Sequence, residues 1–404
     1  MNTGPITFGI DHLLSDEILM RALRGRRIGL VGHPASTTSG LTHTLDALID
    51  SDLPVQAAFG PQHGMRGDKQ DNMIESEDYL DERHHIPVYS LYGQHRRPTP
   101  SQLQDLDVIV IDLQDIGCRI YTYLTTLAYF IEACAEQGKS LWVLDRPNPA
   151  GRRIEGLTLM QGQESFVGCG PIPMRHGLTL GEFASWYADF RRLDLDLNIV
   201  ELQGYDPAAG PGYGWPVLER AWVNPSPNAA SLNMARCFPG TVLLEGTELS
   251  EGRGTTRPLE LMGAPDLPVN DLLTRMHQLA PAWMTGAVMR PCYFEPTFHK
   301  HQQQLCSGIQ IHTDLPTYDP QMFSAFRMVA LLLKALRLLR PDYAIWRHHA
   351  YEYELDRIPI DVINGGPLLR QWVDDPKAEI MDLETQLSKD EAQWLKQTNP
   401  FYRY

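Results

Sequence analysis

The sequence has few positive charges and no long apolar run, and these two absences exclude several classes of protein. Its 404 residues carry 35 Lys and Arg against 50 Asp and Glu, a formal net charge of −15. A nucleic-acid groove or an anionic membrane would need a basic surface, so we expect neither partner. No run approaches the ~18 apolar residues of a membrane-spanning helix. Residues 1–20 also lack the basic start of a signal peptide, so we expect a cytoplasmic protein.

Paired cysteines and glycine-rich nucleotide motifs are missing as well. The six cysteines lie far apart without a C-x-x-C pair, which favours reduced thiols over a disulfide framework or a zinc site. The first predicted strand ends in GLVGHPAS, where His33 and Pro34 stand at positions that a dinucleotide fingerprint fills with glycine. A P-loop motif is also absent. We therefore expect no cofactor.

Short apolar runs alternate with helical stretches in the first 200 residues. The length and the 43% apolar content are typical of a folded chain with two domains. Strands that are apolar throughout indicate a parallel sheet covered on both faces, so we predict an α/β, Rossmann-like domain over residues 1–265. The predicted strands are 27–32, 54–59, 87–93, 107–113, 140–145 and 197–202, and two of the helices are 41–51 and 124–139.

The composition of the sequence changes after a third predicted helix, which begins at a capping box formed by Thr179 and Glu182. Residues 204–265 are rich in glycine and proline and predict loops that close over a cleft. A smaller α+β domain is predicted over residues 266–404. Its helices are expected at 269–279, at 323–340 and from Ser388 onward, and its strands at 287–294 and 306–313.

Polar residues follow the predicted strands where ligands of open α/β sheets bind, outside the carboxyl ends. The run FGPQHGMRGDKQDN (59–72) leaves a strand and presents Gln62, His63 and Arg66 on a frame of three glycines. A core cannot satisfy all these polar groups, so the run predicts a site. Other candidates at strand ends are Tyr92, Asp112, Gln114, Asp115, Arg119, Arg146 and Asn148.

The run IVIDLQDIGCRIYTYLTTL (109–127) carries two aspartates three positions apart, Asp112 and Asp115. Two carboxyl groups held close together have different pKa values, which is one way to obtain an acid and a base. Alternatively, one aspartate caps the following helix and pairs with Arg119. Tyr121 and Tyr123 follow within reach of the same site.

Three further groups of residues have both a functional and a structural interpretation. Arg175 and His176 precede a capped helix, whose positive end favours an anion. Glu251 and Arg253 stand between glycines in SEGRGTT, a pattern that also suits a solvated loop. His63, Asp112 and His176 would be adequate ligands of zinc or iron, although histidines more often bond only backbone carbonyls.

Taken together, the motifs resemble those of the NamZ family of exo-β-N-acetylmuramidases, which are glycoside hydrolases. The matching runs extend from about residue 27 to residue 404. They include PQHGMRG, PVYSLYG, DVIVIDLQDIGCRIYTY, VLDRPNPAG, PIPMRHGLTLGE, PSPN, PGTVLLEGTELSEGRGTTRPLE, FEPTF and CSGIQIH.

The resemblance implies a Rossmann-like N-terminal domain, a smaller C-terminal domain and an active site in the cleft between them. It implies release of N-acetylmuramic acid, or a related amino sugar, from the non-reducing end of peptidoglycan-derived fragments. The family usually has P-E-H-G where this chain has Gln62, an amide that does not exchange a proton at useful pH. Asp112 and Asp115 are then the nearest replacements, with Glu75, Glu77, Glu245 and Glu251 in reserve.

The resemblance also suggests how the sugar is held. Arg66, Arg119, Arg175 or Arg253 would bind the lactyl carboxylate of N-acetylmuramic acid, since a guanidinium matches a carboxylate with two hydrogen bonds. Tyr92, Tyr121 and Tyr123 would stack on sugar faces, and the P-S-P-N motif contributes Ser226 and Asn228. Two alternatives stay open: a sugar-binding or regulatory protein without turnover, and a metal-assisted hydrolase. The chain is also compatible with a homodimer.

Overall fold

Six short apolar runs form strands of the larger sheet, as predicted. The structure is a computed structural model that describes residues 5–67 and 75–404. Within these residues the larger sheet has seven strands in the order β3-β4-β2-β1-β5-β6-β7, parallel throughout except for β3 at one edge. The strands are β1 Ile28–Val31, β2 Val55–Gly60, β3 Tyr79–Leu80, β4 Pro87–Ser90, β5 Val108–Ile111, β6 Ser140–Leu144 and β7 Leu197–Val200.

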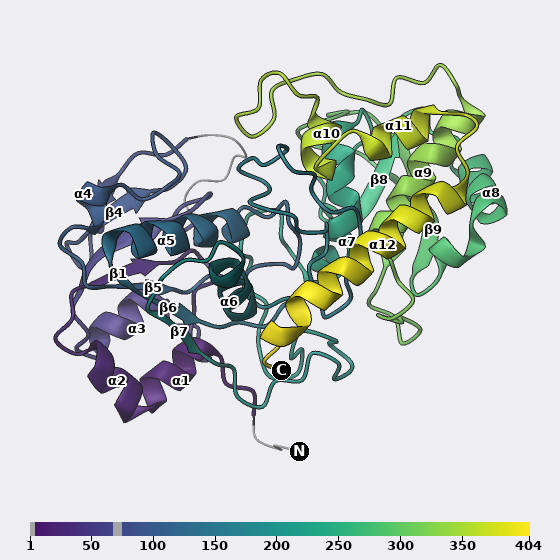
Figure 1. The fold of residues 1–404 in the computed structure, drawn as a ribbon. Helices are drawn as coiled ribbons and strands as arrows, with labels where there is room; N and C mark the ends of the chain where they lie inside the picture. Colours follow the sequence, from purple (N-terminus) through teal and green to yellow (C-terminus); the bar gives the residue numbers. More distant parts are fainter. Residues whose placement is uncertain (1–4, 68–74) are drawn as a thin grey trace.

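Helices cover both faces of this sheet because its strands are apolar on both sides. Along β5, Ile109 and Ile111 pack against α5 and α6, whereas Val108 and Val110 face the core formed with α1 to α3. Figure 1 shows α5 and α1 to α3 on opposite sides of the sheet. The helices are α1 Gly9–Ser15, α2 Glu17–Leu23, α3 Thr44–Asp50, α4 Pro100–Leu103, α5 Tyr123–Gln137 and α6 Leu180–Phe190.

The second unit combines a small antiparallel sheet with a group of helices. The sheet has the order β8-β10-β9, and the apolar helix α9 packs against α7, α8 and α11. Its strands are β8 Leu261–Ala264, β9 Val288–Phe294 and β10 Cys306–His312. Its helices are α7 Leu232–Thr241, η1 Val242–Gly246, α8 Val269–Leu279, η2 Pro281–Met284, α9 Ala325–Leu339, α10 Pro359–Asn364, α11 Leu368–Asp374, α12 Ile380–Thr398 and η3 Asn399–Phe401. The predicted α/β fold with a smaller α+β unit is confirmed.

Two local predictions were wrong. The glycine- and proline-rich residues 204–265 are not only loops, since they contain α7, η1 and β8. Pro239 lies inside α7 and hid its helical pattern, but Ser231 caps the helix. The last long helix begins at Ile380 rather than Ser388, because Glu379 and Asp382 form a capping box there. The predicted boundary after residue 265 stays a prediction, although β8 before it already pairs with β10.

Helix α12 connects the two units (Figure 1). It begins beside the second unit and crosses to the larger sheet, where it ends near α6. Trp394 is 1% exposed and packs edge-on against Trp186 of α6, with ring centroids 4.6 Å apart. Its indole Nε1 donates to the backbone oxygen of His176 at 2.8 Å. The last turns of α12 are therefore part of the core of the first unit.

None of the helices in the described part of the chain combines the length and the apolar character needed to cross a bilayer.

We expect Trp394→Ala to lower the free energy of unfolding by about 3–5 kcal/mol, because it leaves a cavity beside Trp186 and an unpaired carbonyl at His176. Denaturant titration followed by circular dichroism measures this change. Leu395→Ala is the matched control, since Leu395 is 46% exposed on the same helix. Equal losses for the two variants would contradict this role of α12.

Candidate active site

The turn after β2 places Gln62 and His63 at the carboxyl end of the sheet. His63 and Gly64 both have positive φ, 73° and 77°, which bends the chain sharply back over the strand. The Gln62 side chain is buried and its orientation is fixed, because Thr122 Oγ1 donates to its Oε1 at 3.1 Å. Its Nε2 then donates to Oε1 of Glu352 at 3.3 Å. The first unit thus meets a residue from the far end of the chain.

Glu352 lies on a two-residue hairpin turn between Tyr351 and Glu354. The backbone of Tyr351 donates to Glu354 at 3.1 Å, and Glu354 donates back at 2.9 Å. Both central residues, Glu352 and Tyr353, have positive φ, 43° and 72°. Such a turn normally uses Asn and Gly, and a non-glycine residue in this region costs about 1–3 kcal/mol. The fold therefore tolerates strain to hold the Glu352 side chain in place.

The carboxyl group of Glu352 is buried between the two units. It is 8% exposed, and Tyr92 donates its hydroxyl to Oε2 at 2.9 Å. Burial raises the pKa of Glu352 to about 7, against the hydrogen bonds from Tyr92 and Gln62, which lower it, and with the charge of Glu245, which raises it. Glu352 therefore holds a proton in a large fraction of molecules at neutral pH.

A second carboxyl group, that of Glu245, faces the same pocket from η1. Arg253 NH2 lies 2.6 Å from its Oε1, and the Tyr351 hydroxyl donates to its Oε2 at 2.7 Å. Both partners donate, so Glu245 accepts with both oxygens as an ion-paired carboxylate. Burial lowers the pKa of Arg253, but the charges of Glu245 and Glu251 outweigh burial and raise it.

These residues line one pocket between the sheet edge, η1 and the hairpin turn. The pocket has a volume of ≈ 490 Å³, open solvent included. One side is polar, and the other is apolar with Ile120, Val167 and Phe238. Seven of the residues predicted for the site line it: Gln62, His63, Tyr121, Ser226, Asn228, Glu245 and Arg253. Tyr92 stands behind them and contacts Glu352.

Asp112 lies outside this pocket, in a buried ion pair. Arg146 binds it with two nitrogens, Nε at 2.5 Å and NH2 at 2.9 Å, and Thr44 donates to Oδ2 at 2.5 Å. The side chain is fully buried. Asp112 and Arg146 therefore form an ion pair whose charges neutralise each other in the core.

Asp115 is also held by structural contacts. His176 Nε2 lies 3.1 Å from its Oδ2, and the Gly117 amide donates to the same oxygen at 2.6 Å. The other ring nitrogen of His176 accepts from the Leu178 amide at 3.1 Å, so Nε2 carries the proton. Gln114 donates to the backbone oxygens of Asp115 and Pro147.

Several residues predicted to bind substrate instead bond to the protein itself. Their partners are backbone oxygens or carboxylates within the fold. Arg119 donates to three carbonyls, Tyr123 to Pro225 and Asn148 to Leu178, whereas Arg175 pairs with Glu155 and Arg66 with Asp46. The reserve residues Glu75 and Glu77 are exposed. Residues 68–72 of the run FGPQHGMRGDKQDN, and residues 73 and 74 after it, lie outside the described part of the chain.

Glu251 belongs to a buried cluster behind the pocket. Lys300 Nζ lies 2.6 Å from its Oε2, and Arg253 Nε lies 3.2 Å from its Oε1. Burial raises the pKa of Glu251, but the charges of Lys300 and Arg253 outweigh burial and lower it to about 2. Glu251 is therefore a fixed anion that positions Arg253 and carries no proton at neutral pH.

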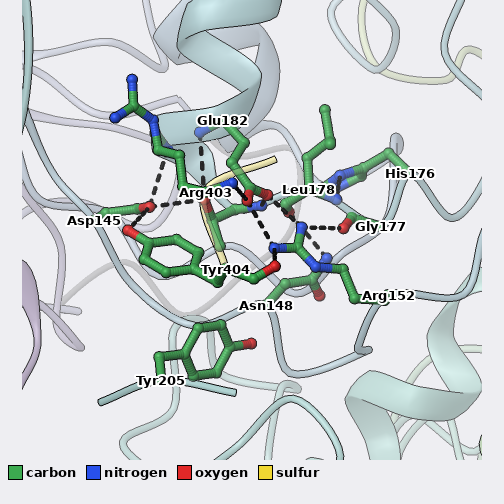
Figure 2. Close-up of polar contacts among 12 residues, drawn as sticks. Asp145, Asn148, Arg152, His176, Gly177, Leu178, Glu182, Tyr205, Arg403 and Tyr404 are labelled. Atoms are coloured by element: carbon green, nitrogen blue, oxygen red, sulfur yellow. Dashed lines mark hydrogen bonds and ion pairs between the residues drawn. The ribbon is translucent and has the colours of Figure 1, made fainter. Parts of the chain in front are cut away.

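The end of β6 is occupied by the last residues of the sequence. Figure 2 shows Tyr404 donating its hydroxyl to Asp145 Oδ2, at 2.8 Å, while Arg152 binds Glu182 with two nitrogens. Arg152 also donates to the backbone oxygen of Tyr404 at 3.1 Å. This part of the sheet edge is thus filled by the protein, and the pocket lies beside the turn after β2 and the segment between β5 and α5 instead.

The predicted metal ligands do not converge. Over residues 5–67 and 75–404, no three His, Cys, Asp or Glu side chains gather in a way that would hold a metal ion. His63 lines the pocket, whereas Asp112 is bound by Arg146 and His176 by Asp115.

Comparison with known proteins assigns the family. Models of the N-terminal and C-terminal parts of exo-β-N-acetylmuramidase NamZ match residues 28–233 and 236–404. The chain belongs to the NamZ family. The peptidoglycan β-N-acetylmuramidase NamZ of Bacillus subtilis strain 168 is 40% identical over 336 residues, which cover 83% of this chain and 78% of that protein.

Two solved structures from Bacteroides fragilis NCTC 9343, both DUF1343 family proteins, share the fold. One has 30% identity and a TM-score of 0.85, with 99% of each chain covered. The other has 24% identity and a TM-score of 0.75 over 99% of each chain, and it supports the fold alone.

The sequence analysis missed Glu352, Tyr351 and Thr122. Glu352 lies 290 residues from Gln62 along the chain, so no local motif joins them. A signal was present in YEYE (351–354), where acidic and aromatic residues alternate between two helices without any helical period. Such a segment predicts an exposed loop, and Tyr351 and Glu352 are instead buried.

We expect Asp112→Asn to lower the free energy of unfolding by about 3–5 kcal/mol, because it leaves the charge of Arg146 buried and unpaired. Thermal or denaturant unfolding measures the loss. The double variant Asp112→Asn with Arg146→Met is the control and should recover part of the stability, since both charges are gone. A fully stable Asp112→Asn protein would show that this pair is not structural.

Proposed function

We propose that this chain is an exo-acting β-N-acetylmuramidase. In this proposal it releases N-acetylmuramic acid, or a related amino sugar, from the non-reducing end of peptidoglycan-derived fragments. Membership of the NamZ family makes it a glycosidase, and the curated relative from Bacillus subtilis acts on peptidoglycan. The pocket is the proposed site of cleavage.

The observation that carries the proposal is the pair of carboxyl groups in one pocket. Glu352 is buried with a raised pKa, whereas Glu245 is an ion-paired carboxylate beside Arg253. Glycoside hydrolysis typically uses two carboxyl groups whose surroundings give them different protonation states. The apolar side of the pocket, with Ile120, Val167 and Phe238, suits the acetamido and lactyl methyl groups.

Arg253 is the proposed partner of the lactyl carboxylate. Of the four arginines considered from the sequence, it lines the pocket, whereas Arg66, Arg119 and Arg175 are bound elsewhere. The distinguishing feature of Arg253 is its position, since its guanidinium is charged and reaches the pocket where a sugar carboxylate would lie.

The two alternatives lose their main support. The idea of a silent sugar-binding protein rested on Gln62, which cannot exchange a proton, yet Glu352 supplies a carboxyl group 3.3 Å from it. The metal-assisted hydrolase needed His63, Asp112 and His176 to converge, and they do not. Action on recycled fragments in the cytoplasm and a homodimeric state remain predictions.

We expect the protein to release free N-acetylmuramic acid from the disaccharide of β-1,4-linked N-acetylmuramic acid and N-acetylglucosamine. Chromatography of the products measures the release. The same disaccharide extended by N-acetylglucosamine at its non-reducing end is the control, and an exo-acting enzyme should leave it intact. Cleavage of the extended substrate, or a preference for β-N-acetylglucosaminides, would contradict the proposal.

A further inference from the structure

Gln62 and Glu352 form a hydrogen bond in the wall of the pocket, with Nε2 and Oε1 3.3 Å apart. The amide and the carboxyl group have different roles in this contact, because only the carboxyl group can exchange a proton. Thr122 donates to Gln62 Oε1, so the amide nitrogen must point to Glu352. A protonated Glu352 fits this arrangement, since Oε1 then accepts from Gln62 as a carbonyl oxygen. Its Oε2 accepts from the Tyr92 hydroxyl at 2.9 Å and, as the hydroxyl oxygen of the protonated acid, still has its own proton to donate.

We propose that Glu352 is the proton donor for glycosidic bond cleavage and that Gln62 is the positioning residue that orients it. This inference rests on the proposed function. Glu352 gives its proton to the glycosidic oxygen as the bond from that oxygen to C1 breaks and the electron pair leaves with the oxygen. A water forms the new bond to C1, and the proton that it loses restores the carboxyl group of Glu352, directly or through solvent.

The other carboxyl groups nearby do not suit this role. Glu245 is paired with the charged guanidinium of Arg253, which favours its ionised form, whereas the hydrogen-bond partners of Glu352 are an uncharged amide and a phenol. Glu251 is fixed by Lys300 behind the pocket and does not line it. Among the described residues that line the pocket, Glu352 is therefore the carboxyl group whose surroundings favour the protonated form.

The strained turn supports a functional role for this position. Asn and Gly would form the same turn without cost, yet residues 352 and 353 are Glu and Tyr. Strain of this kind is concentrated at functional sites, where the surrounding structure fixes an unfavourable conformation. The hairpin turn directs the Glu352 side chain toward Gln62. Glu354, the other acid of the hairpin, pairs instead with Arg357, 2.7 Å away.

The pH dependence follows from the same surroundings. The groups that face Glu352 are Tyr92, Gln62, Glu245, Arg253 and Tyr351, with His63 in the same pocket. Because the pKa of Glu352 is raised to about 7, the donor is present below that pH and is lost above it. We expect kcat/KM to fall on the alkaline side of about pH 7, and this limb should disappear in Glu352→Gln.

The decisive experiment compares two leaving groups in wild type and Glu352→Gln. For the disaccharide of N-acetylmuramic acid and N-acetylglucosamine, the leaving oxygen needs a proton, and kcat should fall about 10²–10⁴-fold in the variant. For 2,4-dinitrophenyl β-N-acetylmuramide, the leaving phenolate needs none, and kcat should be nearly unchanged. Turnover of the dinitrophenyl substrate also shows that the variant is folded.

Two further variants sharpen the test. Glu354→Gln changes the neighbouring acid on the same hairpin and should leave both activities at the wild-type level. Gln62→Glu combined with Glu352→Gln exchanges the two side chains and should recover part of the disaccharide activity, since a carboxyl group again faces an amide. Recovery would not be expected if Glu352 only held the turn in place.

Each outcome decides one question. Unchanged hydrolysis of the disaccharide by Glu352→Gln, or an equal loss on both substrates, would overturn Glu352 as the proton donor and leave the proposed function intact. A wild type that hydrolyses neither substrate would overturn the proposed function itself, and the inference with it.

Discussion

The buried guanidinium of Arg119 fixes the position of the segment that completes the pocket. It donates to the carbonyls of Leu157, at 2.9 Å, and Ile172, at 2.6 Å, in the loop before α6, and to Ile363 of α10 at 2.9 Å. Burial lowers its pKa to about 10, so it remains charged at neutral pH. Because α10 begins five residues after the hairpin turn, this contact sets where Glu352 meets Gln62. A carboxylate partner for Arg119 is unnecessary, since three carbonyl dipoles offset its burial.

The electrostatics of the site follow from the same meeting of the two units. Glu251 pairs with both Lys300 and Arg253, and Arg253 also pairs with Glu245. The charge of Glu245 adds to the burial that raises the pKa of Glu352. A strongly acidic chain thus presents a pocket in which one carboxyl group is fixed as an anion and the next is able to keep its proton. The opposite states arise from different neighbours, one a guanidinium and the other an amide and a phenol.

The sequence predicted most of the fold because its signals are local. Apolar runs such as VIVI of β5 need only their own residues to indicate a buried strand, and Thr179 with Glu182 marks the start of α6 within four positions. Predictions for the site were less complete. Gln62 and Arg253 lie in polar, glycine-rich turns that stand out in the sequence, and Glu245 follows the apolar start of η1. The place of Glu352 in the site depends on a contact across 290 positions. Asp112 had the sequence pattern of a catalytic acid at a strand end, but only the fold shows that both of its carboxylate oxygens are bound by Arg146.

The crossing of α12 limits how the two units can move relative to each other. Its far end is embedded in the first unit through Trp394, and the residues that follow fill the end of β6 around Asp145. Swinging the two units apart as rigid bodies would extract an indole ring from a packed core and break the contacts of Tyr404. A hinge motion between the two units would therefore cost the burial of Trp394 as well as the hydrogen bonds of Tyr404.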